Sequence, residues 1–268
     1  MSDVTYTFIG AGKMATAIAM GMVKSGINPA SIRAYDVSDT ASGAFRTATG
    51  ACVCSTMEEA LAGADTVILA VKPQYASEAL SEAKPFLNGK LLISIAAGLT
   101  ISFLQTASGL DRVIRVMPNT PALALVGMSC YAGAKGISGD DLAIAEKILS
   151  SVGVARKVTE NQLDAVTGLS GSGPAFVMEF IMALADGGVY SGLPRDIALE
   201  MALQTVYGTA KMCQESSLSI GELRDAVISP AGTTAEGILV LQKGSFKGTA
   251  AEAVIAAAER SRELGKGK

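Results

Sequence analysis

The first part of the chain alternates short apolar runs with segments of helical periodicity. Strands are predicted where apolar and β-branched residues follow one another, at residues 4–9, 31–35, 66–71, 91–95, 112–116 and 154–158. Helices are predicted between them, at residues 13–25, 75–84, 102–107 and 143–151. Strands that alternate with helices are typical of a parallel sheet with helices on both faces. We therefore expect an N-terminal α/β domain, a doubly wound parallel sheet of the Rossmann type, over residues 1–160.

The pattern changes after about residue 160, where only helical spacing remains. Helices are predicted at residues 174–191, 194–213, 220–227, 233–242 and 249–264; prolines, which suit the first helical turn, open the first two. Residues 176–184 leave almost no polar face, and a helix that is apolar all round is buried on all sides. A small domain achieves this mainly by packing against another subunit. The sequence therefore predicts an all-helical second domain over residues 161–268 and an assembly of at least two copies.

The composition limits the classes of partner. The net charge is −3 and the isoelectric point is about 5.2, which argues against nucleic acid or an anionic membrane as the main partner. No uninterrupted apolar run approaches the length of about 18 residues that indicates a membrane span. The predicted first strand leaves no room for a signal peptide. We expect a cytoplasmic protein.

The reactive side chains narrow the chemistry further. The cysteines, Cys52, Cys54, Cys130 and Cys213, form no C-x-x-C motif, and the chain has no histidine, so no metal site is expected. Cys52 and Cys54 alternate on a short strand-like run, as small buried apolar residues do. Without imidazole, any acid or base in catalysis must be another group.

A glycine-rich turn lies between the first predicted strand and the first predicted helix. Here the pattern G-x-G-x-x-A is matched by Gly10-Ala11-Gly12-Lys13-Met14-Ala15. Such glycines let the backbone approach a pyrophosphate, and the alanine lets the helix pack closely on the strand. A helix N-terminus also attracts anions through its unpaired N–H groups and its dipole. The turn is predicted to bind a dinucleotide, and a purely structural turn is the alternative.

Asp36 follows the second predicted strand. A carboxylate there accepts hydrogen bonds from the ribose hydroxyls of NAD and repels the 2′-phosphate of NADP. Against this, Arg33 and the hydroxyls of Ser38 and Thr40 are close enough in sequence to accommodate a phosphate. The residues alone therefore leave open both the choice between NADPH and NADH and an exposed aspartate without a ligand.

Further candidates lie at the ends of later strands, where ligands bind in open α/β sheets. Pro73 restricts the backbone where the fourth strand ends. Lys72, just before it, faces the cofactor, the substrate or solvent. The small residues at 94–98 would let a nicotinamide ring lie flat against the backbone. Asn119 and Thr120 stand in a turn braced by prolines, where they either contact a ligand or only form the turn.

A second possible anion site lies far along the chain. The segment that breaks one helix and opens the next is Ser229-Pro230-Ala231-Gly232-Thr233-Thr234. Either its hydroxyls and N–H groups bind a small anion, or they form an ordinary helix cap. The turn at residues 169–174, with two glycines and two serines, favours packing at an interdomain hinge over substrate contact. A cofactor site and a small-anion site in one chain indicate a dehydrogenase or reductase.

Taken together, these motifs resemble the pyrroline-5-carboxylate reductase family, the enzymes that make proline, along the whole chain. The matching segments are the glycine turn and residues 70–73, 164–175, 185–188 and 229–237, of which the last is the family's most specific motif. The resemblance implies a Rossmann domain followed by a helical dimerisation domain, with sites at the dimer interface and homodimers that often assemble further. It implies reduction of L-1-pyrroline-5-carboxylate to L-proline with NADPH or NADH.

The resemblance also assigns residues. It implies that the cofactor is lined by Ile9, Gly10, Ala11, Gly12, Lys13, Met14, Ala70, Val71, Lys72, Pro73, Ile95, Ala96 and Ala97, to which the strand ends add Asp36 and Asn119. It implies that the substrate is held by Ser229, Gly232, Thr233, Thr234 and Glu160. In this assignment Thr234 orients the substrate, and a hydrogen bond to the ring nitrogen is a second possible role. Asp36 and Val37 stand where several relatives have small polar residues near the 2′-phosphate, so the cofactor preference stays open.

The missing histidine agrees with this chemistry. Reducing a ketone builds an alkoxide and usually needs a positioned proton donor, whereas reducing a protonated cyclic imine turns a cation into a neutral amine. One rival is a β-hydroxyacid dehydrogenase, which would need a lysine and an asparagine on the helix where residues 176–184 offer only Glu179. Another is a nucleotide-binding regulatory protein without turnover, against which the second anion site argues.

Overall fold

The structure is a computed structural model that describes residues 5–266 and divides into two compact units. The first unit comprises residues 1–172 and 256–268, and the second comprises residues 173–255. The predicted division into an NAD(P)-binding Rossmann domain of residues 1–160 and a helical dimerisation and substrate-binding domain of residues 161–268 stays a prediction.

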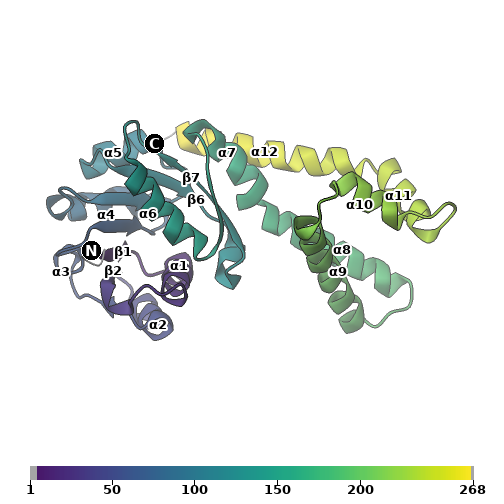
Figure 1. The fold of residues 1–268 in the computed structure, drawn as a ribbon, viewed down its shortest axis with the longest axis horizontal. Coiled ribbons are helices and arrows are strands. Elements are labelled where there is room, and N and C mark those ends of the chain that lie inside the picture. Colours follow the sequence, from purple (N-terminus) through teal and green to yellow (C-terminus); the bar gives the residue numbers. More distant parts are fainter. Residues whose placement is uncertain (1–4, 267–268) are drawn as a thin grey trace. The chain divides into compact units, whose positions relative to one another are not determined.

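The first unit is built on an eight-stranded sheet with the strand order β3-β2-β1-β4-β5-β6-β7-β8 (Figure 1). Its strands are β1 (Tyr6–Ile9), β2 (Ile32–Tyr35), β3 (Cys52–Val53), β4 (Thr66–Leu69), β5 (Leu91–Ser94), β6 (Val113–Met117), β7 (Gly127–Gly133) and β8 (Gly153–Lys157). Every neighbouring pair is parallel except β6 and β7. The order reverses between β1 and β4, and this switch point is where ligands bind in doubly wound folds.

Helices cover both faces of this sheet, as the alternating pattern predicts (Figure 1). They are α1 (Lys13–Lys24), α2 (Asp39–Thr49), α3 (Met57–Leu61), α4 (Ala76–Ala83), α5 (Ile101–Ser108), α6 (Gly139–Ser150) and α7 (Leu163–Val166). One core joins α1, α2 and α6 to the sheet through Ile18, Phe45 and Ile148. The other joins α3, α4 and α5 to it through Leu61, Leu80 and Leu104. Both faces of the central strands are therefore dry, which explains why their sequences are continuous apolar runs.

Three elements differ from the sequence-based expectation. The sequence pattern does not predict α2 or α3, because these short helices carry many small polar and acidic residues, and α2 has one large apolar side chain, Phe45. The antiparallel β7 is also missed, because glycine, serine and cysteine give it no apolar run. The predicted doubly wound, mainly parallel sheet is confirmed, and β6–β7 is the antiparallel pair among its described strands. Val4 of the first predicted strand lies outside the described residues.

The second unit is helical. Its helices are α8 (Gly173–Tyr190), α9 (Arg195–Glu215), α10 (Ile220–Val227), α11 (Thr233–Lys243) and the first half of α12 (Phe246–Lys266). The buried cluster of this unit consists of three alanines, Ala185, Ala198 and Ala202, where α8 packs on α9. Methyl groups bury little area, so this packing contributes little to the stability of a single copy.

The end of α12 belongs to the first unit. Ser261 is 8% exposed, and its hydroxyl donates a hydrogen bond of 2.7 Å to Asp164 Oδ1 on α7. Ala258, one turn earlier, is also buried. The C-terminal turns of the chain are thereby attached to the segment that follows the sheet.

One ion pair fastens α6 to the amino edge of the sheet. Arg112 precedes β6 and donates to Asp141 Oδ1 at 2.5 Å and to Oδ2 at 3.1 Å. Asp141 N–H donates to Ser138 Oγ at 3.1 Å, and the side chain of Asp141 is only 3% exposed. The hydrogen bonds from Arg112 hold the pKa of the Asp141 carboxyl below its ordinary value of 3.8, in spite of its burial.

We expect Asp141→Asn to lower the free energy of unfolding at neutral pH by about 1.5–3 kcal/mol, the range for hydrogen bonds to charged groups. Because the folded pKa is depressed, the wild-type contribution is complete above the ordinary pKa of about 3.8 and disappears as the pH falls through the lowered value. Urea unfolding between pH 3 and pH 7 measures this. The matched control is Asp140→Asn, which removes an exposed neighbouring carboxylate in the same first turn. Equal losses for the two variants would contradict the assignment.

Candidate active site

The predicted cofactor residues meet at the carboxyl edge of the central strands. The ends of four neighbouring strands, β2, β1, β4 and β5, are joined by three backbone hydrogen bonds: Gly10 N–H to Tyr35 O at 2.8 Å, Ala70 N–H to Ile9 O at 2.8 Å, and Ile95 N–H to Leu69 O at 3.0 Å. The structure thus places the segments 9–14, 70–73 and 95–97 side by side, along with Asp36 after β2. Their role in holding a cofactor stays a prediction.

Gly10 makes the closest approach at this edge. Its φ is +99°, a backbone conformation that residues with a side chain rarely adopt. A Cβ built there would lie 2.9 Å from the carbonyl carbon and oxygen of Ala70 and 3.0 Å from Val71 N. The turn after β1 is therefore packed against the end of β4 so tightly that only glycine fits.

Gly12 supplies the complementary feature, which is open space. It is the N-cap of α1 with φ −69°, and an added Cβ would meet nothing within 4 Å. Because glycine has no side chain, Gly12 offers no oxygen to the N–H groups of the first turn of α1, which point out of the helix end. A pyrophosphate fits such a site, since backbone donors and the helix dipole face the open space.

Asp36 is held by two backbone donors. Its Oδ2 accepts from Ala11 N–H at 2.7 Å, and its Oδ1 accepts from Ser38 N–H at 2.8 Å. The Ser38 hydroxyl accepts from Ala41 N–H and thereby caps α2. The carboxylate is fixed beside the glycine turn, and each oxygen keeps a further lone pair for a ligand.

Arg33, the other residue considered for a 2′-phosphate, has its guanidinium on α3. Its Nη1 donates to Ala62 O at 2.6 Å and to Glu59 O at 3.3 Å. These carbonyls lie at the C-terminal end of a helix, where a cation is favourable. The structure therefore gives Arg33 a structural position.

Two other predicted site residues also have structural contacts. Asn119 Oδ1 accepts from Met128 N–H at 2.8 Å, which ties the turn after β6 to β7 and agrees with the turn-forming interpretation. Glu160 Oε1 accepts from Ile101 N–H at 2.7 Å, at the N-terminus of α5, and from Arg115 at 3.3 Å. Ligand contact by either residue stays a prediction.

Sequence reasoning missed Arg115. This side chain is 10% exposed on β6 and forms an ion pair with Glu160 at 3.3 Å. A lone arginine in an otherwise apolar strand, Val-Ile-Arg-Val-Met, was the signal in the sequence. A buried cation needs a partner, and that requirement predicts a nearby carboxylate without identifying it.

The second predicted site is the turn before α11. Ala231 has φ +53°, and Gly232 is the N-cap, so the residue at the cap has no side-chain oxygen. Gly232 N–H bonds to Ser229 O at 3.0 Å, and a Cβ on Gly232 would lie 2.2 Å from Ser229 Oγ. Neither Thr233 nor Thr234 is at the capping position, because α11 begins with them. This geometry argues against the ordinary helix cap and leaves the first N–H groups available to an anion.

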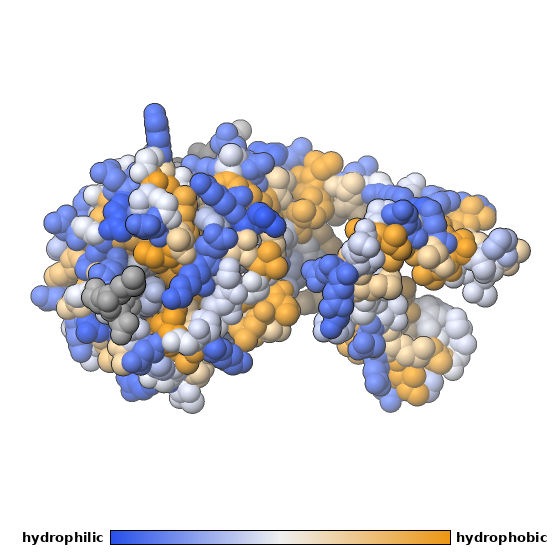
Figure 2. Space-filling view, in the orientation of Figure 1, coloured by the Kyte–Doolittle hydropathy of each residue, from blue (hydrophilic) through white to orange (hydrophobic). Residues whose placement is uncertain are grey.

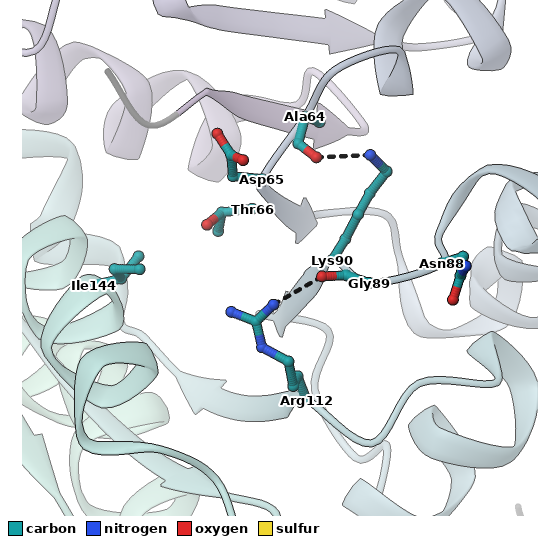
Figure 3. Close-up of a pocket in the computed structure, with 8 residues that line it drawn as sticks. All are labelled: Ala64, Asp65, Thr66, Asn88, Gly89, Lys90, Arg112 and Ile144. Carbon is teal, nitrogen blue, oxygen red and sulfur yellow. Dashed lines mark hydrogen bonds between the residues drawn. The ribbon is translucent and has the colours of Figure 1, made fainter. Parts of the chain in front are cut away.

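A polar hollow of about 270 Å³ lies at the other edge of the sheet, where β4, β5 and β6 begin. Figure 3 shows Lys90 reaching the carbonyl oxygen of Ala64, at 2.6 Å, and Arg112 reaching that of Gly89, at 2.7 Å. These cations are used to fasten loops at the amino edge. None of the predicted site residues lines this hollow.

A doubly wound sheet with a glycine turn and an open helix N-terminus at its carboxyl edge defines the class of dinucleotide-dependent oxidoreductases. Comparison with known proteins narrows this class. Residues 5–98 match the family model described as NADP oxidoreductase, coenzyme F420-dependent. Residues 160–264 match the model described as pyrroline-5-carboxylate reductase dimerisation. The chain belongs to the pyrroline-5-carboxylate reductase family.

Relatives match over nearly the whole chain. The pyrroline-5-carboxylate reductase of Arabidopsis thaliana is 47% identical, with 96% of this chain and 94% of that protein covered. The one from Methanosarcina acetivorans is 46% identical over 99% of this chain and 100% of its own length. Among solved structures, the Plasmodium falciparum enzyme with NADP bound is 35% identical, covers 99% of both chains and has a TM-score of 0.86. The Coxiella burnetii enzyme is 32% identical, covers 98% of this chain and 99% of its own, and has a TM-score of 0.93.

We expect the two glycines of the turn to respond differently to alanine. Gly10→Ala should lower stability by about 2 kcal/mol or more, because it adds both a left-handed alanine and a backbone clash. Gly12→Ala should leave thermal stability unchanged and weaken cofactor binding, because its methyl group enters only the open space. Thermal unfolding and calorimetric titration with NADH and NADPH check the pair. Unchanged cofactor affinity in a folded Gly12→Ala variant would show that the pyrophosphate lies elsewhere.

Proposed function

We propose that the chain reduces L-1-pyrroline-5-carboxylate to L-proline with a hydride from NADPH or NADH, the last step of proline biosynthesis. The observation that carries the proposal is that two helices, α1 and α11, have a glycine as N-cap and therefore no side-chain cap. They occur in a chain with 47% identity to a pyrroline-5-carboxylate reductase. The first matches the requirement of a dinucleotide pyrophosphate and the second that of a substrate carboxylate.

The residues divide the work in the following way. The turn at Gly10 and Gly12 holds the cofactor, which supplies the hydride when bound. The N-terminus of α11 binds the substrate carboxylate through its backbone N–H groups, with the hydroxyls of Ser229, Thr233 and Thr234 nearby. Holding one end of a small ring fixes its imine carbon in space, and such positioning contributes much of the rate in a two-substrate reaction.

Hydride transfer to a protonated imine needs no side chain that acts as an acid or a base. A protonated cyclic imine carries the positive charge that the hydride neutralises, so no alkoxide develops and no acid has to deliver a proton in that step. The chain supplies no imidazole for such a role, since it has no histidine. We assign Thr234 to substrate orientation, with a hydrogen bond to the ring nitrogen as its second possible contact.

We expect the purified chain to oxidise NADH or NADPH when pyrroline-5-carboxylate is added and to form proline. Thr234→Ala should raise KM for the imine by about tenfold to a hundredfold, the loss of a hydrogen bond to a charged group, while cofactor affinity stays unchanged. Thr234→Ser keeps the hydroxyl and should recover most of the loss. Absorbance of the reduced nicotinamide follows turnover, and proline is measured separately. A folded sample without turnover on either cofactor would refute the function, and unchanged kinetics in Thr234→Ala would refute only the role of that hydroxyl.

The second unit supports a homo-oligomer, which we propose to be a dimer or an assembly of dimers. Figure 2 shows hydrophobic surface over its helices. The exposed apolar side chains include Val177, Met178, Met182, Leu184, Leu199, Met201, Leu203, Leu239, Val240 and Leu241. So much apolar surface indicates a protein or membrane contact.

The segment Glu160–Tyr190 is long and apolar enough to cross a membrane by length and composition, with 11% of its most apolar part buried. The family model described as pyrroline-5-carboxylate reductase dimerisation matches residues 160–264 and therefore includes this whole segment. We assign its surface to a second copy of the chain for that reason. The four cysteines are free, which agrees with a reducing compartment and a cytoplasmic location.

We expect Met178→Glu to prevent assembly and to remove activity together. Met178 is 59% exposed in the single chain, so a charge there spares the fold of one copy. Ile181 is a poorer choice, because it packs on the alanine cluster between α8 and α9. Light scattering and the reductase assay are the measurements, and Val154→Glu on the exposed side of β8 is the control. A fully active monomer of the wild-type chain at assay concentration would rule the proposal out.

A further inference from the structure

We propose that Asp36 makes this chain selective for NADH over NADPH. The proposal rests on the proposed function, because it concerns the cofactor of the same site. Its basis is the arrangement of charges where β2 ends, beside the glycine turn. At this position in a doubly wound fold the adenosine ribose of a dinucleotide lies within reach of the residue that follows the second strand.

The first argument is that the carboxylate of Asp36 cannot turn away easily. Ala11 N–H holds one oxygen at 2.7 Å and Ser38 N–H holds the other at 2.8 Å. Tyr35, the preceding residue, is itself tied to the turn by the bond from Gly10 N–H. A ribose with two free hydroxyls donates to the remaining lone pairs of such a group, whereas a 2′-phosphate has no proton to donate at neutral pH and carries like charge.

The second argument is that the nearest arginine is engaged elsewhere. Arg33 donates to Ala62 O at 2.6 Å and to Glu59 O at 3.3 Å, at the C-terminal end of α3. Moving it to a phosphate would break both bonds and leave the carbonyl groups at the end of α3 without their donor. Arg33 therefore does not offset the charge of Asp36.

The third argument concerns the hydroxyls. The Ser38 hydroxyl caps α2, and Asp39 adds a second carboxylate in the first turn of that helix. The adjoining hollow of about 510 Å³ includes Lys13 and Thr40, but most of its lining is alanine, methionine and leucine. Lys13 is the charged side chain in this lining, while Asp36 and Asp39 after β2 carry two negative charges, so the net charge of these three residues is unfavourable for an added phosphate.

The test compares binding, which does not depend on turnover. The wild-type chain, Asp36→Asn and Asp39→Asn are titrated with NADH and NADPH by calorimetry. Asp39→Asn is the matched control, because it removes the same charge from an exposed position three residues away. We expect the wild type to bind NADH at least tenfold more tightly, Asp36→Asn to lose most of this ratio, and Asp39→Asn to keep it. The wild-type ratio should also fall as salt is added, since screening weakens repulsion.

Two further variants test whether Asp36 sets the ratio of NADH to NADPH affinity. Asp36→Ser repeats the test with a smaller side chain if Asp36→Asn unfolds, and Arg33→Gln should leave the ratio unchanged. Equal or tighter binding of NADPH by the wild type would overturn the proposal. So would a ratio that Asp36→Asn and Asp36→Ser leave intact, or one that Asp39→Asn changes equally. A folded wild type that binds neither dinucleotide would overturn the proposed function as well, whereas binding of both in equal measure overturns only the selectivity.

Discussion

The close approach of the turn after β1 to the end of β4 is the constraint on which the first unit depends. Gly10 stands at φ +99° with its α-carbon against the Ala70 carbonyl group, and its N–H bonds to Tyr35 O on the other neighbouring strand. The same turn presents Ala11 N–H to Asp36. Three strand ends and the start of α1 are thus fixed by one residue without a side chain. The contacts that join these strand ends also position the residues that we predict to bind the cofactor.

Helix beginnings in the described part of the chain differ in their caps, and α4, α7 and α9 have no side-chain cap. Serine or threonine side chains cap α2, α3, α5, α6 and α10, through Ser38, Thr56, Thr100, Ser138 and Ser219. By contrast, α1 and α11 begin after glycines, and their first N–H groups receive no oxygen from the capping residue. A side-chain cap adds about 1 kcal/mol of stability. Its absence at both proposed anion sites fits helices whose missing acceptor is a ligand.

The sequence predicts the parts of this molecule that follow from local pattern. The dry strands β1, β4 and β5 are recognisable as apolar runs, and the glycine turn as a motif. Arg33, Glu160 and Arg115 are different, because long side chains reach across elements and only the packed structure decides their partners. The sequence alone leaves open whether the guanidinium of Arg33 or the carboxylate of Asp36 faces the cofactor ribose. Their backbone partners, Ala62 O and Ala11 N–H, separate them.

The second unit links folding to assembly. A core of three alanines gives a single copy little hydrophobic stabilisation, while Met178, Met182 and Leu199 remain exposed to water. Burial of those side chains against a second copy would supply the missing area, and stability would then depend on protein concentration. The turn before α11, which we propose to bind the substrate, belongs to this same unit. We therefore expect the geometry of that turn to depend on a scaffold that association stabilises, since a single copy buries only three alanines between α8 and α9.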